Sequence, residues 1–233
     1  MKTSNIFPVF LLIGLIACTS ESENLALNQI AQFYECNTSF SKGVSTSIEE
    51  GSRKTFTVEL SGGEILSQIN PNLIASNSAL ILYAGLNDEE RSNYTHIEIV
   101  VNQSEENSTK TTEVAIPVEE LSLVNSKAFV LNECFGLLKD KDYEGLITGM
   151  SEELKEELDL EDLPVQLDQI ETDDGVLMDF AVQGYEIFNA DISGENMELL
   201  QIYGTFVREQ KTTRCYVVVP TAENDNRLYG FNF

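Results

Sequence analysis

Apolar residues change their spacing repeatedly along the first half of the chain, and each change predicts a new element. Residues 24–37 carry apolar side chains at helical spacing, which predicts an amphipathic helix. Alternation over Val44–Ile48 and Phe56–Leu60, on either side of a turn sequence at residues 49–52, predicts a β-hairpin. The helical positions are Leu27, Ile30, Ala31 and Tyr34.

A second helix and a second pair of strands follow the hairpin. Asn70 and Pro71 suit the cap and first position of a helix that ends near Gly85. His96–Asn102 and Thr111–Pro117 then alternate as strands. The order α-β-β-α-β-β is typical of an α+β module.

The second half changes from helices to strands. Glu119–Lys139 predicts a long helix that joins the halves, Tyr143–Met150 a short one, and Ser151 caps a further helix. After Gly175 the alternation predicts four antiparallel strands, with a bulge where Gly184 interrupts the first. The other three strands are expected over Met197–Glu209, Thr212–Pro220 and Arg227–Phe233. The chain is therefore predicted to be α+β, with modules at residues 25–117 and 118–233.

The first seventeen residues have the character of a targeting segment. Lys2 precedes an apolar run, Ile6–Ala17, that matches the core of a signal peptide. The run is too short for a membrane-spanning helix, which needs about 20 residues. Residues 1–17 are therefore interpreted as a signal peptide.

The sequence Leu15-Ile16-Ala17-Cys18 resembles the lipobox of bacterial lipoproteins. The resemblance implies cleavage before Cys18 and a lipid on its sulfur that attaches the protein to a membrane. Thr19 stands where an Asp would imply inner-membrane retention, so the outer membrane is expected. The alternative is an ordinary secretory signal in which Cys18 is incidental. Residues 18–24 are expected to form an acidic, flexible tether.

The charge excludes one class of function and leaves another open. With 39 acidic and 14 basic residues the net charge is −25, which repels phosphate groups, so nucleic-acid binding is not expected. Residues 151–174 hold eleven acidic residues and one basic residue, Lys155. They are interpreted as a solvated helix face. The acidity of the whole chain is interpreted as a source of solubility, with a cationic partner or loosely held divalent cations as the alternative.

Three cysteines remain once Cys18 carries lipid. Cys134 falls on an apolar helix face, Cys215 alternates with valines in a strand, and Cys36 ends the first helix. An envelope location permits disulfides, but no pair has a diagnostic spacing. Free thiols are the expectation, with one disulfide as the alternative. No Cys-x-x-Cys or paired His predicts a metal site.

Several segments of the C-terminal half resemble the NTF2-like (cystatin-like) fold, in particular small bacterial envelope domains of that class. They are the helix pair at Asp142–Leu158, then Gly175, the sequence QGYEIF at Gln183–Phe188, and the final LYGFNF. The resemblance implies that residues 118–233 form a bent antiparallel sheet packed on helices. It also implies a cone-shaped pocket at one end of the domain.

Enzymes of that fold use an Asp/His pair, or acidic and Tyr groups, in the cone. Here the only histidine, His96, lies in the other module. Asp179, Tyr185 and Tyr203 are the strand residues best suited to face a pocket. Asp179 would serve as a base if burial raised its pKa, but without a neighbouring His a solvated sheet edge is favoured. No nucleophile or phosphate-binding motif is present, and no cofactor is expected.

These observations predict a membrane-anchored envelope lipoprotein that is not an enzyme and that binds a protein or small ligand through its C-terminal domain. Two alternatives stay open. The first is an acidic inhibitor or immunity-type protein whose residues 152–174 occupy a basic partner. The second is an enzyme that uses the cone pocket.

Overall fold

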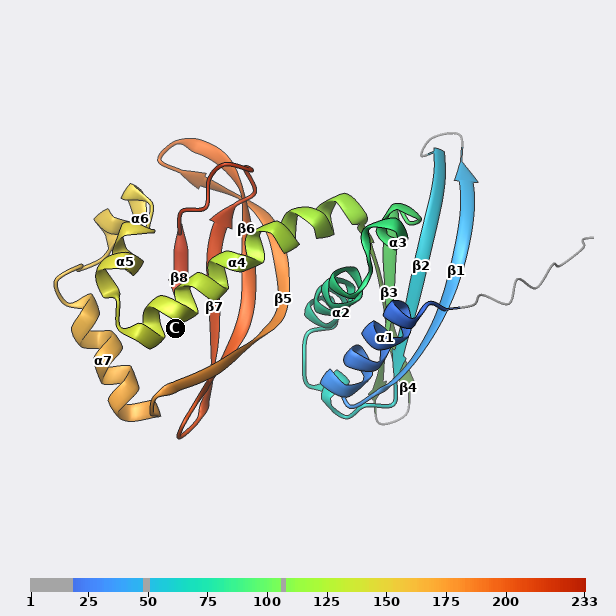
Figure 1. The fold of residues 1–233 in the computed structure, drawn as a ribbon, viewed down its shortest axis with the longest axis horizontal. Helices are drawn as coiled ribbons and strands as arrows, with labels where there is room; N and C mark the ends of the chain where they lie inside the picture. The colour runs from blue at the N-terminus through green and yellow to red at the C-terminus, as the bar shows by residue number, and fades with distance from the viewer. Residues whose placement is uncertain (1–18, 48–50, 106–107) are drawn as a thin grey trace, which may run out of the picture.

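The computed structural model describes residues 19–47, 51–105 and 108–233. Cys18 and the signal segment lie outside these residues. In the described part the chain forms seven α-helices, one 3-10 helix and two four-stranded sheets, neither of which closes into a barrel. Figure 1 shows the sheets standing side by side, with the long helix α4 passing from one module to the other. The predicted α+β class is therefore confirmed.

The N-terminal module covers one face of its sheet with helices. Its elements are α1 (Glu21–Phe33), β1 (Asn37–Ser47), β2 (Gly51–Ser61), the 3-10 helix η1 (Ile65–Ser67), α2 (Pro71–Gly85), α3 (Asp88–Ser92), β3 (His96–Glu105) and β4 (Ser108–Pro117). The strand order is β1-β2-β3-β4, and only β2 and β3 are parallel, because α2 lies in the crossover between them. The predicted hairpin, the Asn70 cap and the end of α2 at Gly85 are confirmed.

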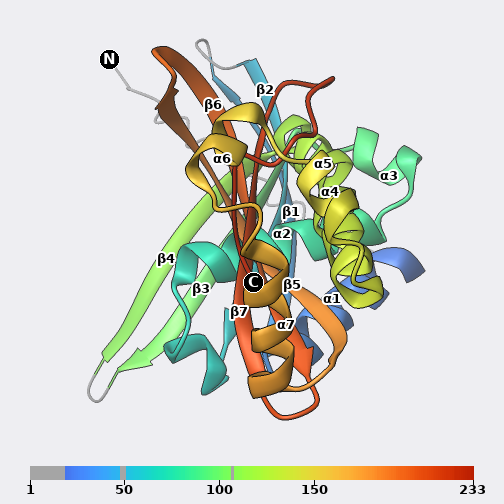
Figure 2. The same ribbon diagram turned by 90° about the vertical axis from the view of Figure 1, so that its left-hand side faces the viewer.

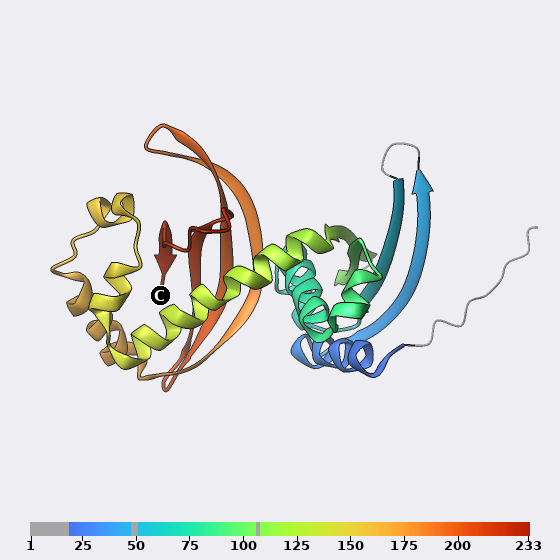
Figure 3. The same cartoon turned by 45° about the horizontal axis from the view of Figure 1, so that its top comes forward.

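The C-terminal module wraps a curved sheet around α4. Its elements are α4 (Val118–Asp140), α5 (Tyr143–Thr148), α6 (Glu152–Glu157), α7 (Leu163–Asp174), β5 (Leu177–Ile192), β6 (Glu195–Arg208), β7 (Thr212–Pro220) and β8 (Gly230–Asn232). The order β5-β6-β7-β8 is antiparallel throughout, as predicted. Figure 3 shows α4 on the concave side of this sheet and α2 on its convex side. The convex face is thus turned toward the N-terminal module.

The two modules meet where β5 bends at Gly184. The strand register shifts between Val182 and Gly184, so the predicted bulge is confirmed. The Tyr185 N–H donates to Ser76 Oγ of α2 at 3.0 Å, and that hydroxyl donates to the Leu73 carbonyl at 3.2 Å. A Cβ on Gly184 would lie 2.7 Å from both of these α2 oxygens. Only glycine lets the strand approach the helix this closely.

The segment predicted to be a flexible tether is folded from Ser20 onward, so that prediction is wrong for these residues. Ser20 and Glu23 form a capping box at the start of α1. Glu23 is only 2% exposed, and its carboxylate accepts hydrogen bonds from the Lys42 ammonium at 2.7 Å and the Tyr94 hydroxyl at 2.8 Å. A buried, fully bonded carboxylate fixes this end of the helix against the sheet.

We expect Gly184→Ala to destabilise the protein by about 2 kcal/mol or more, because its φ of +139° and the close α2 oxygens both oppose a side chain. Gly194→Ala is the matched control: it also has positive φ, but nothing lies within 4 Å of the added carbon. Urea unfolding of both variants measures the difference. Equal losses at the two positions would contradict the close contact with α2.

We expect Glu23→Gln to cost about 2 kcal/mol at neutral pH. Burial opposes ionisation of Glu23, but hydrogen bonds from Lys42, the Ser20 N–H and Tyr94 outweigh it and lower its pKa below 4.5. The stabilisation is therefore complete above the ordinary carboxyl pKa and is lost as pH falls through the lowered value. The difference in unfolding free energy between wild type and variant, measured at pH 7, 5 and 3, should decrease as the pH falls. A gap independent of pH would refute the role of this carboxylate.

Candidate functional site

The convex face of the C-terminal sheet carries two rows of polar and aromatic side chains. Tyr203 of β6, Tyr216 of β7 and Asn232 of β8 pair across the strands in one row. Thr205 and Arg214 pair in the next row. Residues in register on adjacent strands share a face, so these side chains project together toward the N-terminal module.

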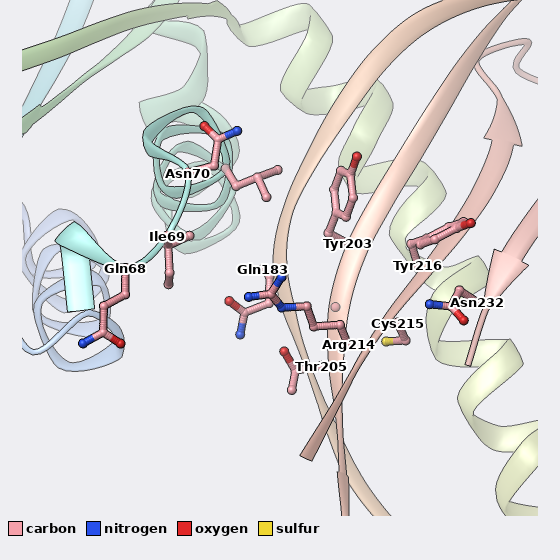
Figure 4. Close-up of a pocket in the computed structure, with 12 residues that line it drawn as sticks. Gln68, Ile69, Asn70, Gln183, Tyr203, Thr205, Arg214, Cys215, Tyr216 and Asn232 are labelled. Atoms are coloured by element: carbon pink, nitrogen blue, oxygen red, sulfur yellow. The ribbon is translucent and has the colours of Figure 1, made fainter. Parts of the chain in front are cut away.

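A segment of the N-terminal module forms the opposite wall. Gln68, Ile69 and Asn70 connect η1 to α2, and Leu73 lies in the first turn of α2. Between this wall and the sheet lies a cleft of about 420 Å³, which Figure 4 shows with the two walls facing each other. Its lining residues are Gln68, Ile69, Asn70, Leu73, Gln183, Tyr203, Gly204, Thr205, Arg214, Cys215, Tyr216 and Asn232.

The η1–α2 wall is held in place by a buried amide. Gln103 of β3 is 8% exposed, and its Nε2 donates to the carbonyl oxygens of Leu66 and Ile69, the latter at 3.1 Å. At the other end of the segment, Asn70 accepts from the Asn72 N–H at 3.0 Å and caps α2. The wall is thus tied to the sheet behind it and to the helix after it, which preorganises the cleft.

Arg214 is the only charged side chain among the residues that line the cleft, and all of them belong to the described part of the chain. A guanidinium group carries a positive charge and five N–H donors in a planar arrangement. Figure 4 shows Arg214 extending along the sheet toward Gln183. No ion pair involves Arg214 within the described ranges. The cleft therefore offers an exposed positive charge in a protein of strongly negative net charge.

Two other groups of the cleft, the Cys215 thiol and the Tyr203 hydroxyl, have raised pKa values. Burial raises the pKa of the Cys215 thiol to about 12, so it is not a thiolate nucleophile. Burial, together with the nearby Glu186 carboxylate, raises the pKa of Tyr203, whose hydroxyl donates to Glu186 at 3.2 Å. The rings of Tyr203 and Tyr216 meet edge to face, with centroids 6.3 Å apart. These groups suit hydrogen bonding and apolar contact better than proton transfer.

The structure separates the three residues that the sequence singles out. Tyr203 lines the cleft. Tyr185 pairs with Ile202 and lies on the concave face, where it is buried and donates to Glu120 of α4 at 2.7 Å. Burial and that carboxylate raise the pKa of Tyr185. Asp179 is exposed on the edge strand β5 and accepts from the Phe180 N–H at 2.8 Å.

Sequence reasoning missed most of the cleft. The alternation of residues in β7 indicates one part of the cleft, because Arg214 and Tyr216 fall on the face opposite to Cys215 and Val217. No sequence pattern indicates that Gln68, Ile69 and Asn70 line the cleft, because they do so only through the contact between the modules. His96 begins β3 in the other module, with Nδ1 3.0 Å from Thr95 Oγ1.

The described residues also show the state of the cysteines and whether metal ligands or membrane-spanning helices are present. Cys36, Cys134 and Cys215 are free, as expected. Within residues 19–47, 51–105 and 108–233 no group of three His, Cys, Asp or Glu side chains is placed to hold a metal ion. None of the helices in these ranges is long and apolar enough to cross a bilayer. No protein-family model, curated protein or solved structure matches the chain.

Proposed function

We propose that the protein is a lipid-anchored envelope lipoprotein that is not an enzyme and that binds a small ligand in the cleft between its two modules. The observation that carries the proposal is the composition of the cleft. Two tyrosine rings, four side-chain amides and the guanidinium of Arg214, which forms no ion pair within the described ranges, line the same cleft. Concave sites with a few convergent polar groups are typical of small-ligand binding.

The charge of Arg214 limits which classes of ligand the cleft can bind. A guanidinium forms two parallel hydrogen bonds with a carboxylate, and such charge-assisted bonds are about twice as strong as neutral ones. The side-chain amides of Gln68, Asn70, Gln183 and Asn232 can both donate and accept. We infer a ligand with a carboxylate, further polar groups and an apolar face for the tyrosines.

The anchor is the second part of the proposal. It is supported by the lipobox sequence that ends at Cys18. The residue after Cys18 is Thr19 and not Asp, which favours the outer membrane. Ser20 already caps α1, so only Thr19 separates the lipidated position from folded structure. The two residue steps from Cys18 to Ser20 span about 7 Å when extended, which would hold the N-terminal module against the membrane surface.

The third part of the proposal is an NTF2-like fold for the C-terminal module. A helix on the concave side of a curved, antiparallel sheet, with shorter helices before the first strand, supports an NTF2-like arrangement for residues 118–233. In this protein the proposed ligand site lies on the convex face, outside the cone that the resemblance implies.

One observation favours a second function. Most of the acidic residues at positions 152–174 are exposed on α6, on α7 and on the loop between them, where they would suit a basic protein partner. Binding of that kind weakens steeply as salt increases. Binding in the cleft rests on a single charged pair and should weaken much less with salt than binding through many carboxylates, so the steepness of the salt dependence separates the two functions.

We expect Cys18→Ser to prevent both lipidation and cleavage before residue 18, so that the intact mass of the variant is that of the unprocessed chain. Cys36→Ser is the control, because Cys36 is a half-buried free thiol within the N-terminal module. Fractionation and intact mass of both variants provide the readout. A Cys18→Ser protein processed like the wild type, or a wild-type protein whose intact mass shows an unmodified Cys18, would exclude the lipid anchor.

We expect carboxylate probes to bind more tightly than their amides and Arg214→Gln to abolish the preference. Ligand-observed NMR with paired probes, such as N-acetyltyrosine and N-acetyltyrosinamide, measures it. The expected preference is about tenfold, since one charge-assisted pair contributes roughly 1.5 kcal/mol. Arg53→Gln, on β2 of the other module, should behave as wild type. The same preference in Arg214→Gln would show that the cleft does not recognise the carboxylate.

A further inference from the structure

The convex face of the C-terminal sheet continues past the cleft as an apolar surface. On β6 the alternation that places Tyr203 and Thr205 in the cleft places Val207 next on the same face. The partner of Val207 on β7 is Thr212, two residues before Arg214. Val207 is 38% exposed and lies beyond the residues that line the cleft. The surface around Val207 is therefore continuous with the Arg214 end of the cleft.

A bulge adds a second apolar side chain to this surface. The register of β5 and β6 shifts between Leu177 and Asp179, so Met178 and Asp179 both oppose Val207. Met178 is 58% exposed. Leu177, by contrast, pairs with Arg208, and both are buried on the concave side, which α7 covers at this end of the sheet (Figure 2). Val207 and Met178 together form what we call the apolar extension of the cleft.

Arg214 lies between two apolar surfaces on the convex face. On one side are the rings of Tyr203 and Tyr216, and Figure 4 shows Arg214 and Thr205 beneath them. On the other side is the apolar extension. Successive rows of side chains on one face of a sheet are about 7 Å apart along the strand, so both surfaces are within reach of one small molecule. A carboxylate paired with Arg214 would thus stand between two apolar parts of its ligand.

The charges around Arg214 fix which part of the ligand lies where. Arg214 is the charged residue of the cleft lining, and it forms no ion pair within the described ranges. Asp179 is exposed at the margin of the apolar extension, where its carboxylate would repel a second carboxylate. The negative group of the ligand therefore belongs at Arg214, and the extension suits an uncharged apolar chain.

We propose that the ligand of the cleft is an N-acyl amino acid, with its carboxylate on Arg214, its side chain against Tyr203 and Tyr216, and its acyl chain over the apolar extension. In this class of compound the carboxylate, the side chain and the acylated nitrogen branch from one carbon atom. A fatty acid, whose charge is at the end of a single chain, would cover only one of the two surfaces. The side chains of Thr205 and Gln183 line the cleft and can bond to the amide of the acyl group. The inference rests on the proposed ligand site and names the class of compound that it takes.

The test compares N-acetyltyrosine with N-octanoyltyrosine by isothermal titration calorimetry, below the concentration at which the longer compound forms micelles. We expect the octanoyl compound to bind the wild-type protein about tenfold more tightly, a modest gain because the extension covers only one side of the chain. Val207→Ser should bring the two affinities close together. Val165→Ser is the matched control and should keep the tenfold preference, because Val165 is also exposed but lies on α7, at the other side of the sheet.

Met178→Ser provides a second variant, should Val207→Ser fail to fold, and it should also reduce the preference for the octanoyl compound. Equal affinities of the two compounds for the wild-type protein would overturn the inference while leaving the carboxylate site in place. A tenfold preference that persists in both Val207→Ser and Met178→Ser would overturn it as well. So would octanoate binding as tightly as N-octanoyltyrosine, because the amino acid part would then contribute nothing.

Failure of the proposed function gives a different result. In that case neither tyrosine compound binds the wild-type protein, or both bind Arg214→Gln as tightly as the wild type.

Discussion

The contact between the β5 backbone at Gly184 and the α2 helix at Ser76 is the constraint on which the rest of the structure depends. It is a backbone-to-hydroxyl hydrogen bond at a bulge, made possible by a residue without a side chain. Because it fixes the distance between the convex face of one sheet and the helix of the other module, it also fixes the width of the cleft. The cleft is therefore a consequence of how the modules dock.

Strand alternation then divides the C-terminal sheet into two surfaces with different roles. On the concave side Ile202 and Phe206 are buried and the Tyr185 hydroxyl reaches Glu120 of the joining helix. On the convex side Tyr203, Tyr216 and Arg214 stay accessible to the cleft. The two arginines on opposite faces illustrate the division: one lies in an open, amide-lined site and the other in the interior beneath α7.

Local signals predicted the elements well, because each depends on neighbours in sequence. The Asn70 cap, the end of α2 at Gly85 and the bulge at Gly184 all follow from the conformational preferences of single residues. The flexible tether was predicted from the polar and acidic composition of residues 18–24 alone. The spacing of Ser20 and Glu23 is that of a capping box, which is a local signal for the start of a helix. The cleft was beyond such signals, because Gln68 and Arg214 are brought together only by the docking of the modules, which no local pattern encodes.

Differential scanning calorimetry of the wild-type protein tests the docking contact most directly, because it asks whether the two modules unfold as one unit. A shared interface predicts one transition in which the calorimetric enthalpy equals the van't Hoff enthalpy. Two resolved transitions, with one module melting while the other stays folded, would show that the contact at Gly184 does not couple the modules and that the cleft between them is not a fixed site.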